Sequence, residues 1–206
     1  MLVACARGRN EERVVEPLVD AAPPTPVDAA PTDAPPLPDA STCTMPFTGT
    51  LATWSFSGAA GGQPATVAAT SASGVVAGSV TRAAGLTAVS GATSINASGW
   101  PLATTIDPAK YYTFTIAPPS GCTSTLTSAA LDARASGTGP ASAALATSID
   151  AFAAKVPVST TAATTATLAV ANASGTVEVR IYGYGAAATT GTLRLQNTIS
   201  LVGSLQ

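Results

Sequence analysis

The stretch TVEVRIYGY, residues 176–184, alternates apolar and polar side chains from end to end. In an extended chain, successive side chains point to opposite faces. Val177, Val179 and Ile181 therefore share one face, and the opposite face carries Glu178, Arg180, Tyr182 and Tyr184. Strict alternation of this kind predicts a β-strand with one face on a hydrophobic core.

Two further stretches have the same pattern. In YYTFTIA, residues 111–117, every second residue is a large apolar one, and in TLRLQ, residues 192–196, two leucines alternate with polar residues. Strand-favouring Thr, Val and Ser dominate between Gly-rich breaks, whereas helix-favouring Glu and Lys are almost missing. The sequence therefore predicts an all-β, antiparallel two-sheet sandwich.

Eight segments are the predicted strands of this sandwich. They are Leu51–Phe56, Gly74–Thr81, Tyr111–Ala117, Ser124–Leu131, Ala144–Phe152, Thr164–Ala171, Thr176–Tyr184 and Gly191–Val202. The run SIDAFAAKV, residues 148–156, fits a helical turn as well as it fits a strand. Trp54 and Phe56 are two residues apart in one predicted strand, so we expect both rings in the core.

Charge is scarce and unevenly spread. Only 10% of the 206 residues are charged, and the formal net charge of −2 divides into −4 over residues 1–44 and +2 over residues 45–206. The sequence has no basic stripe, which argues against nucleic acid as a partner. It also has no run of 18 apolar residues, so we expect no membrane-spanning segment.

The first five residues, Met1-Leu-Val-Ala-Cys5, resemble the end of a bacterial lipoprotein signal, in which the Cys receives the lipid. The basic and apolar parts of a signal peptide are missing before them, so either the true start lies upstream or the match arose by chance. The resemblance implies export to the bacterial cell envelope or surface. It also implies that a lipid on Cys5 is the only contact with the membrane.

The next segment has a different composition. Residues 17–41 read PLVDAAPPTPVDAAPTDAPPLPDAS and contain no aromatic residue. Such a segment buries too little apolar surface to offset the entropy lost on ordering. We therefore expect residues 6–42 to be a disordered linker, reaching roughly 110 Å in polyproline geometry, and residues 43–206 to form the sandwich domain.

Cysteine usage fits an oxidising compartment. Cys43 opens the predicted domain and Cys122 lies in its middle, which favours a disulfide between them, the alternative being two separate buried thiols. The sequence contains no His and no Cys-x-x-Cys pair, so it has no ligand set for zinc.

A set of short motifs resembles a jelly-roll-like β-sandwich family of exported bacterial proteins, some of which carry a PEP-CTERM sorting tail. The motifs are TWSF at 53–56, GSVTRAAGL at 78–86, KYYTFTI at 110–116, LDARASGTGP at 131–140, SIDAF at 148–152 and VRIYGYGAAATTGTLRLQN at 179–197. The resemblance implies a jelly-roll-like fold, similar to that of carbohydrate-binding modules, and implies no enzymatic activity. Gln196 stands where that family commonly has Asp, which weakens a cation role for this position.

The residues themselves also argue against catalysis. Without His there is no Ser-His-Asp or Cys-His arrangement. A glycosidase needs two carboxylates that flank one bond, and after residue 44 the chain has only Asp107, Asp132, Asp150 and Glu178, each with a reading as a turn residue or an ion-pair partner. No cofactor is expected, although Asp132, Asp150 and Asn197 carry oxygens that would suit a structural Ca²⁺.

The predicted ligand-binding residues are polar and aromatic. Arg180, Tyr182 and Tyr184 share a strand face, and a hairpin through residues 185–191 would place Arg194 and Gln196 beside them. The alternative is that the rest of the molecule covers this face, with Arg180 paired to Asp150 or Asp132. Trp100 lies in a loop, either as a plug over the end of the sandwich or as a platform for a sugar.

The function expected from these features is that of a non-catalytic binding module displayed at the cell surface, with a polysaccharide or another surface protein as ligand. Two alternatives remain open. One is a structural coat protein that packs with surface proteins through its Thr/Ser/Ala-rich faces. The other is a polysaccharide hydrolase, which the small number of carboxylates disfavours.

Overall fold

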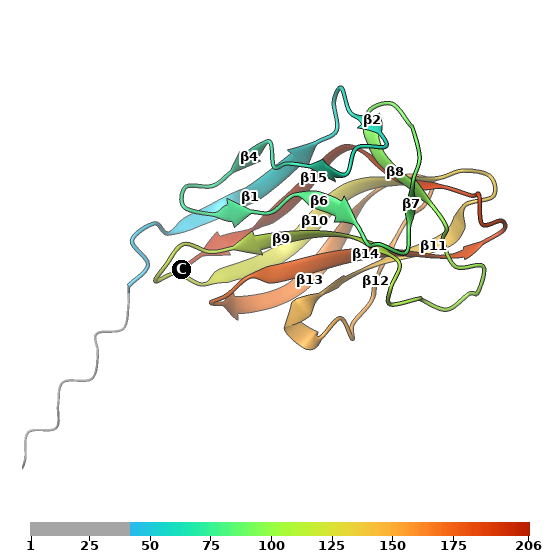
Figure 1. Ribbon diagram of the computed structural model, residues 1–206. Coiled ribbons are helices and arrows are strands. Elements are labelled where there is room, and N and C mark those ends of the chain that lie inside the picture. The colour runs from blue at the N-terminus through green and yellow to red at the C-terminus, as the bar shows by residue number, and fades with distance from the viewer. Residues whose placement is uncertain (1–41) are drawn as a thin grey trace, which may run out of the picture. The chain divides into compact units, whose positions relative to one another are not determined.

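Two β-sheets lie face to face in residues 42–206, the part of the chain that the computed structural model describes (Figure 1). The predicted all-β, two-sheet sandwich is confirmed. The predicted lipidation site Cys5 lies outside the described residues, as does the predicted linker 6–42 apart from Thr42. One helical element, the three-residue turn η1 (Ser148–Asp150), occurs in the described part, and nothing there is a helix long enough to cross a bilayer.

Sheet A has eight strands, whose main order is β13-β10-β15-β1-β4, and β8 joins β15 beyond the end of β1. Its strands are β1 (Phe47–Ser55), β2 (Ala60–Gly61), β4 (Thr70–Ser71), β7 (Thr87–Ala88), β8 (Ser94–Ser98), β10 (Ser124–Ala135), β13 (Ala163–Ala173) and β15 (Leu193–Leu205). All pairs are antiparallel except that of β2 with β8.

Sheet B has seven strands, in the main order β12-β11-β14-β9-β6-β3, and β5 pairs with β9. Its strands are β3 (Ala65–Thr66), β5 (Val76–Ala77), β6 (Val80–Arg82), β9 (Tyr111–Ala117), β11 (Pro140–Thr147), β12 (Val156–Val158) and β14 (Val177–Ala186). The long strands of both sheets overlap predicted segments, but the predicted strand 74–81 is divided into the short strands β5 and β6. The predicted strand 144–152 is wrong in its second half, because β11 ends at Thr147 and the chain turns into η1.

The chain changes sheet at nearly every connection in its second half. From β8 onward the strands belong to sheets A, B, A, B, B, A, B and A in turn, which is the crossing pattern of a jelly-roll-like sandwich. The predicted hairpin between β14 and β15 is therefore wrong. The connection crosses from sheet B to sheet A, and Ala187 N and Ala188 N donate to the carbonyl of Thr138 on the way.

The core fills the space between the sheets with the predicted apolar faces. Trp54 and Phe56 are fully buried, and the Trp54 ring packs on Phe114 with 4.6 Å between centroids. The indole N–H of Trp54 donates to the carbonyl of Gly78 at 2.8 Å. Aromatic burial with the polar atom satisfied stabilises such a core without leaving an unpaired donor.

Cys43 and Cys122 form the predicted disulfide, with their Cα atoms 4.5 Å apart. The bridge ties the segment that leads into β1 to the turn before β10. The two cysteines are 79 residues apart in sequence, so the bridge closes a long loop and constrains the unfolded chain strongly.

Candidate functional site

The predicted binding face on sheet B is largely covered. The turn formed by residues 148–155, here called the 148–155 turn, folds over it. Ala151 and Phe152 in this turn both have left-handed backbone, which residues other than glycine rarely adopt. That conformation turns the Phe152 ring onto Arg180, whose guanidinium carbon lies 3.9 Å from the ring centroid.

Arg180 is held from several sides. Its guanidinium lies between the rings of Phe152 and Tyr111, and it donates to both oxygens of Glu178, at 2.7 and 3.3 Å. The ion pair thus joins neighbours on β14, not Arg180 to Asp150 or Asp132. Burial alone would raise the pKa of Glu178, but hydrogen bonds from Arg180 and Thr113 outweigh it and the pKa lies below its ordinary value.

Of the other predicted ligand-binding residues, Tyr182 lies near Arg180, because both contact the Tyr111 ring, whereas Tyr184, Arg194 and Trp100 lie elsewhere. Tyr182 is only 2% exposed, with Lys155 over its ring, and Tyr184 is partly exposed beside a hollow next to β12. Arg194 lies on β15 in the other sheet. Trp100 is 1% exposed and packs on Tyr112, so it is a plug in the core.

The outer side of sheet A carries a second polar surface. Strands β10 and β15 place five pairs of outward side chains opposite one another, and we call this surface the β10–β15 face. The pairs are Thr125 with Ser204, Ser128 with Val202, Ala130 with Ser200, Asp132 with Gln196, and Arg134 with Arg194. The residues between them, such as Leu126, Ala129 and Leu201, are buried in the core.

Small side chains keep most of this face shallow. From Ser204 to Arg194 it covers eleven residues of β15, or ten steps of ~3.3 Å, about 30 Å in all. Three hollows lie along this length: one near the chain's C-terminal end, one beside Asp132, and one between the two arginines.

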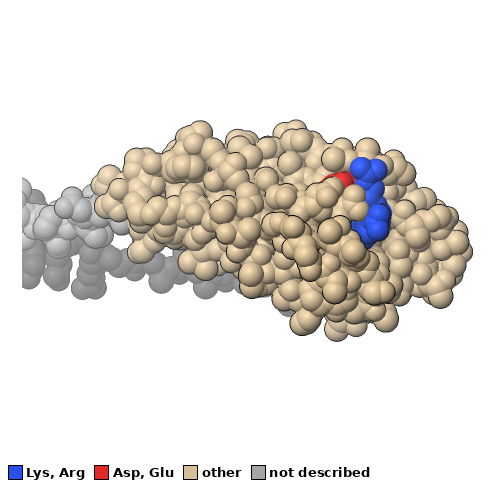
Figure 2. All heavy atoms as spheres, turned by 90° about the horizontal axis from the view of Figure 1, so that it is seen from above, with Lys and Arg blue, Asp and Glu red and all other residues tan. Residues whose placement is uncertain are grey.

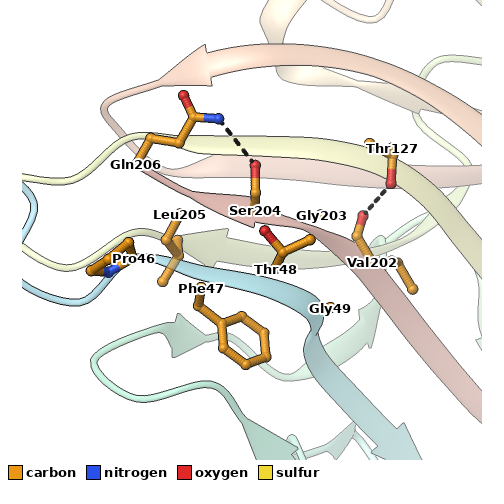
Figure 3. A pocket seen from close by; sticks show the side chains of 10 residues that line it. All are labelled: Pro46, Phe47, Thr48, Gly49, Thr127, Val202, Gly203, Ser204, Leu205 and Gln206. Atoms are coloured by element: carbon orange, nitrogen blue, oxygen red, sulfur yellow. Dashed lines mark hydrogen bonds between the residues drawn. The ribbon is translucent and has the colours of Figure 1, made fainter.

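The first hollow, of about 530 Å³, lies where β1 and β15 pair through Gly49 and Gly203 (Figure 3). A Cβ at Gly203 would come within 1.9 Å of the Thr125 carbonyl oxygen, so only glycine fits there. The hydroxyls of Thr48, Thr127 and Ser204 line this hollow. The Phe47 ring, 40% exposed, lies over Gly49 on the other side of β1, the side that Phe47 shares with its partner Leu205.

Asp132 is the centre of a polar network in the middle of the face. It is 6% exposed, and it accepts hydrogen bonds from Arg134 at 2.6 Å, Gln196 at 3.0 Å and Asn197 at 2.7 Å. Burial acts to raise the pKa of Asp132, but these donors together outweigh it, and the pKa lies below its ordinary value. The carboxylate is therefore a structural anion at neutral pH.

The structure does not assemble the predicted calcium ligands. Asn197 donates its amide N–H to Asp132, while Asp150 lies in η1 and accepts from the backbone N–H of Ala154. Within residues 42–206 no three His, Cys, Asp or Glu side chains come together as a metal-binding group.

The third hollow, of about 210 Å³, lies at the arginine end of the face. Arg134 and Arg194 stand directly opposite each other on β10 and β15. In the view of Figure 2, the basic side chains, in blue, form one cluster, and an acidic side chain, in red, lies next to it. Sequence reasoning missed this pair: LDARA and LRLQ show that both arginines point outward, but not that the two strands are neighbours.

Comparison with protein-family models, with curated proteins and with solved structures finds no match for this chain.

Proposed function

We propose that the protein is a non-catalytic binding module that takes a polysaccharide chain along the β10–β15 face. The observation that carries this proposal is the row of three hollows on one exposed sheet surface about 30 Å long. A row of hollows suits an extended polymer better than a small molecule, which would favour one deep cavity.

The lining supports a sugar ligand in particular. Hydroxyl and amide groups of Thr127, Ser200 and Gln196 offer both donors and acceptors. These groups match the hydroxyls that a chain of sugar rings presents.

The carboxylates support a non-catalytic role. Asp132 and Glu178 are each engaged by an arginine and further donors, and Asp107 and Asp150 accept backbone N–H groups in turns. Catalysis of glycoside hydrolysis needs one carboxylic acid with a raised pKa, whereas the pKa of both Asp132 and Glu178 is lowered.

The setting of this module remains part of the proposal. The resemblance of residues 1–5 to a lipoprotein signal supports export and a lipid anchor on Cys5. A Pro/Ala/Asp-rich spacer behind such an anchor would hold the binding face away from the membrane, where envelope or surface polysaccharides are within reach.

A matched pair of substitutions tests the proposal with the full chain. Ala130→Trp places an indole in the middle of the β10–β15 face, and Ala141→Trp makes the same change at an exposed position on β11 in sheet B. In affinity electrophoresis on gels containing cellulose, xylan, dextran or alginate, we expect wild type and Ala141→Trp to be retarded alike and Ala130→Trp to migrate freely. If none of the gels retards the wild type, or if both variants bind equally, the proposal is wrong.

A second candidate function, packing with copies of itself in a surface coat, is favoured by β13. This strand of 11 residues forms an edge of sheet A and contains neither charge nor proline. Proteins usually protect such long edges, because their free backbone groups pair with other chains. Sedimentation velocity tests this function: the wild type should self-associate and Thr165→Lys with Thr167→Lys should not, and a wild type that stays monomeric at high concentration excludes it.

A further inference from the structure

We propose that the arginine end of the β10–β15 face binds the negatively charged group of an acidic polysaccharide, a uronate carboxylate or a sulfate ester. This inference rests on the proposed function and narrows its ligand class. It depends on three features of the third hollow: an unneutralised cation, a lining of polar groups, and a connection to the rest of the face.

The charges at this end are unbalanced. Arg134 and Arg194 face each other across neighbouring strands, an arrangement in which like charges repel. The nearby carboxylate of Asp132 is bound to Arg134, whose guanidinium also donates to the carbonyl of Thr161. Arg194 is exposed and has no hydrogen bond or ion pair with any residue in 42–206. An anion placed between the two arginines would relieve the repulsion and satisfy Arg194.

The hollow offers more than charge. Ser90, Asn96, Ser136 and Thr192 line it together with the two arginines. Asn96 is 5% exposed, and its amide N–H donates to the carbonyl of Ser90, but its Oδ1 accepts no hydrogen bond from residues 42–206. An unpaired buried acceptor is costly, and a sugar hydroxyl is a donor of the kind that this oxygen lacks.

The neighbourhood of the hollow favours a sugar polymer over other polyanions. Asp132 lies one outward pair away from the arginines, so a densely charged strand such as nucleic acid would meet a negative charge at once. Gln196 and Ser200 continue the face with neutral polar groups. The sugar that places its anionic group at Arg194 also presents hydroxyls, which suit these neutral polar groups.

The guanidinium groups also match the chemistry of the ligand. Carboxylate and sulfate oxygens accept paired N–H donors from arginine in a planar, directional arrangement. Asp132 already fixes the Nε of Arg134 at 2.6 Å, so that side chain is held in place before any ligand arrives. Preorganised donors bind more tightly than mobile ones, because less side-chain entropy is lost.

The test compares three soluble polymers of similar length, alginate, dextran sulfate and neutral dextran, by titration calorimetry with the full chain. Arg194→Gln removes the free cation, and Lys155→Gln removes one positive charge in the 148–155 turn, which packs on the opposite sheet. We expect alginate or dextran sulfate to bind more tightly than dextran. We expect Arg194→Gln to weaken that binding at least about tenfold, the size of one charge-assisted hydrogen bond, and Lys155→Gln to change it less than about twofold.

Each outcome separates this inference from the proposed function. Preference for alginate or for dextran sulfate supports the inference and identifies the anion. Equal weakening by Arg194→Gln and Lys155→Gln, or binding of dextran as tight as that of the acidic polymers, overturns the inference while the proposed function stands. Binding of no polysaccharide in either assay overturns both. Because Arg194 is exposed, its substitution should leave the melting temperature unchanged, which separates lost binding from lost folding.

Discussion

Asp132→Ala tests whether the carboxylate network organises the β10–β15 face. The substitution removes three hydrogen bonds at one site that is 6% exposed: those from Arg134, Gln196 and Asn197. It also removes the negative charge that lies beside Arg134, which then faces Arg194 across the strands without compensation. We therefore expect a marked loss of stability.

The magnitude follows from the three bonds. The charge-assisted bond with Arg134 contributes about 1.5 kcal/mol, the lower end of its range, because the Arg134 side chain is 35% exposed and partly screened by water. The two amide bonds add about 1 kcal/mol each. The sum, a loss of about 3.5 kcal/mol in the free energy of unfolding, corresponds to a melting temperature lower by about 7–14 °C for a domain of this size.

Thermal unfolding followed by circular dichroism measures this loss. Asp150→Ala is the matched control, because Asp150 is exposed and its carboxylate is bonded to a single backbone N–H, that of Ala154. We expect this control to lose less than about 1 kcal/mol. Melting temperatures for the two variants that agree within error would refute the reasoning that Asp132 organises the face.

The same network sets a pH dependence with a defined sign. The pKa of Asp132 in the folded protein lies below its ordinary value of about 3.9. Its stabilising effect is therefore complete above that value and is lost as the pH falls through the lower, folded pKa. The stability difference between wild type and Asp132→Ala should be constant above about pH 5 and shrink below about pH 4. A difference that grows on acidification would contradict this sign.

Three further predictions concern other parts of the molecule. Cys43→Ser with Cys122→Ser opens a crosslink between residues 79 apart, so urea titration should show a loss of about 4.5 kcal/mol, and a curve that coincides with that of the wild type would contradict it. Phe152→Ala removes one of the two rings stacked on Arg180 and should lower the stability by about 1–2 kcal/mol; no change would show that the turn does not hold the face closed. Thr48→Val removes an exposed hydroxyl of the first hollow and should weaken retention on polysaccharide gels without lowering the melting temperature by more than about 4 °C; full retention would place this hydroxyl outside the binding path.

The sequence predicts which face of a strand is buried, and it does so well. Phe114 and Ile181 lie in the core because they belong to the apolar face of strands in which apolar and polar residues alternate. The burial of Trp54 follows from its position two residues before Phe56, because residues two apart in a strand face the same side. The disulfide between Cys43 and Cys122 could also be predicted, because an oxidising compartment and the positions of the two cysteines in the chain favour it.

Which strands pair with each other could not be predicted from the sequence, for a physical reason. Alternation shows which side chains of a strand face the core, but not which strand lies next to it. The connection 187–192 is long enough for a hairpin loop, so its length does not distinguish a hairpin from a crossing between sheets. The register of β10 against β15 shifts twice, between Leu126 and Ser128 and between Ala130 and Asp132. Each shift is set by local backbone irregularity, so no count of residues along the chain reveals that Arg134 meets Arg194.

The crossing that overturned the predicted hairpin is also what creates the arginine end. Had β14 and β15 paired, the Arg194 guanidinium would lie among the rings of sheet B, next to Tyr182. Because the chain passes to sheet A instead, β15 pairs with β10, and Arg194 meets a second arginine whose carboxylate partner is already fixed. One carboxylate cannot neutralise two opposed guanidinium groups, so Arg194 has no anionic partner among residues 42–206. The charge available for binding thus follows from the connection between the sheets, and both of the arginines must be present for it to arise.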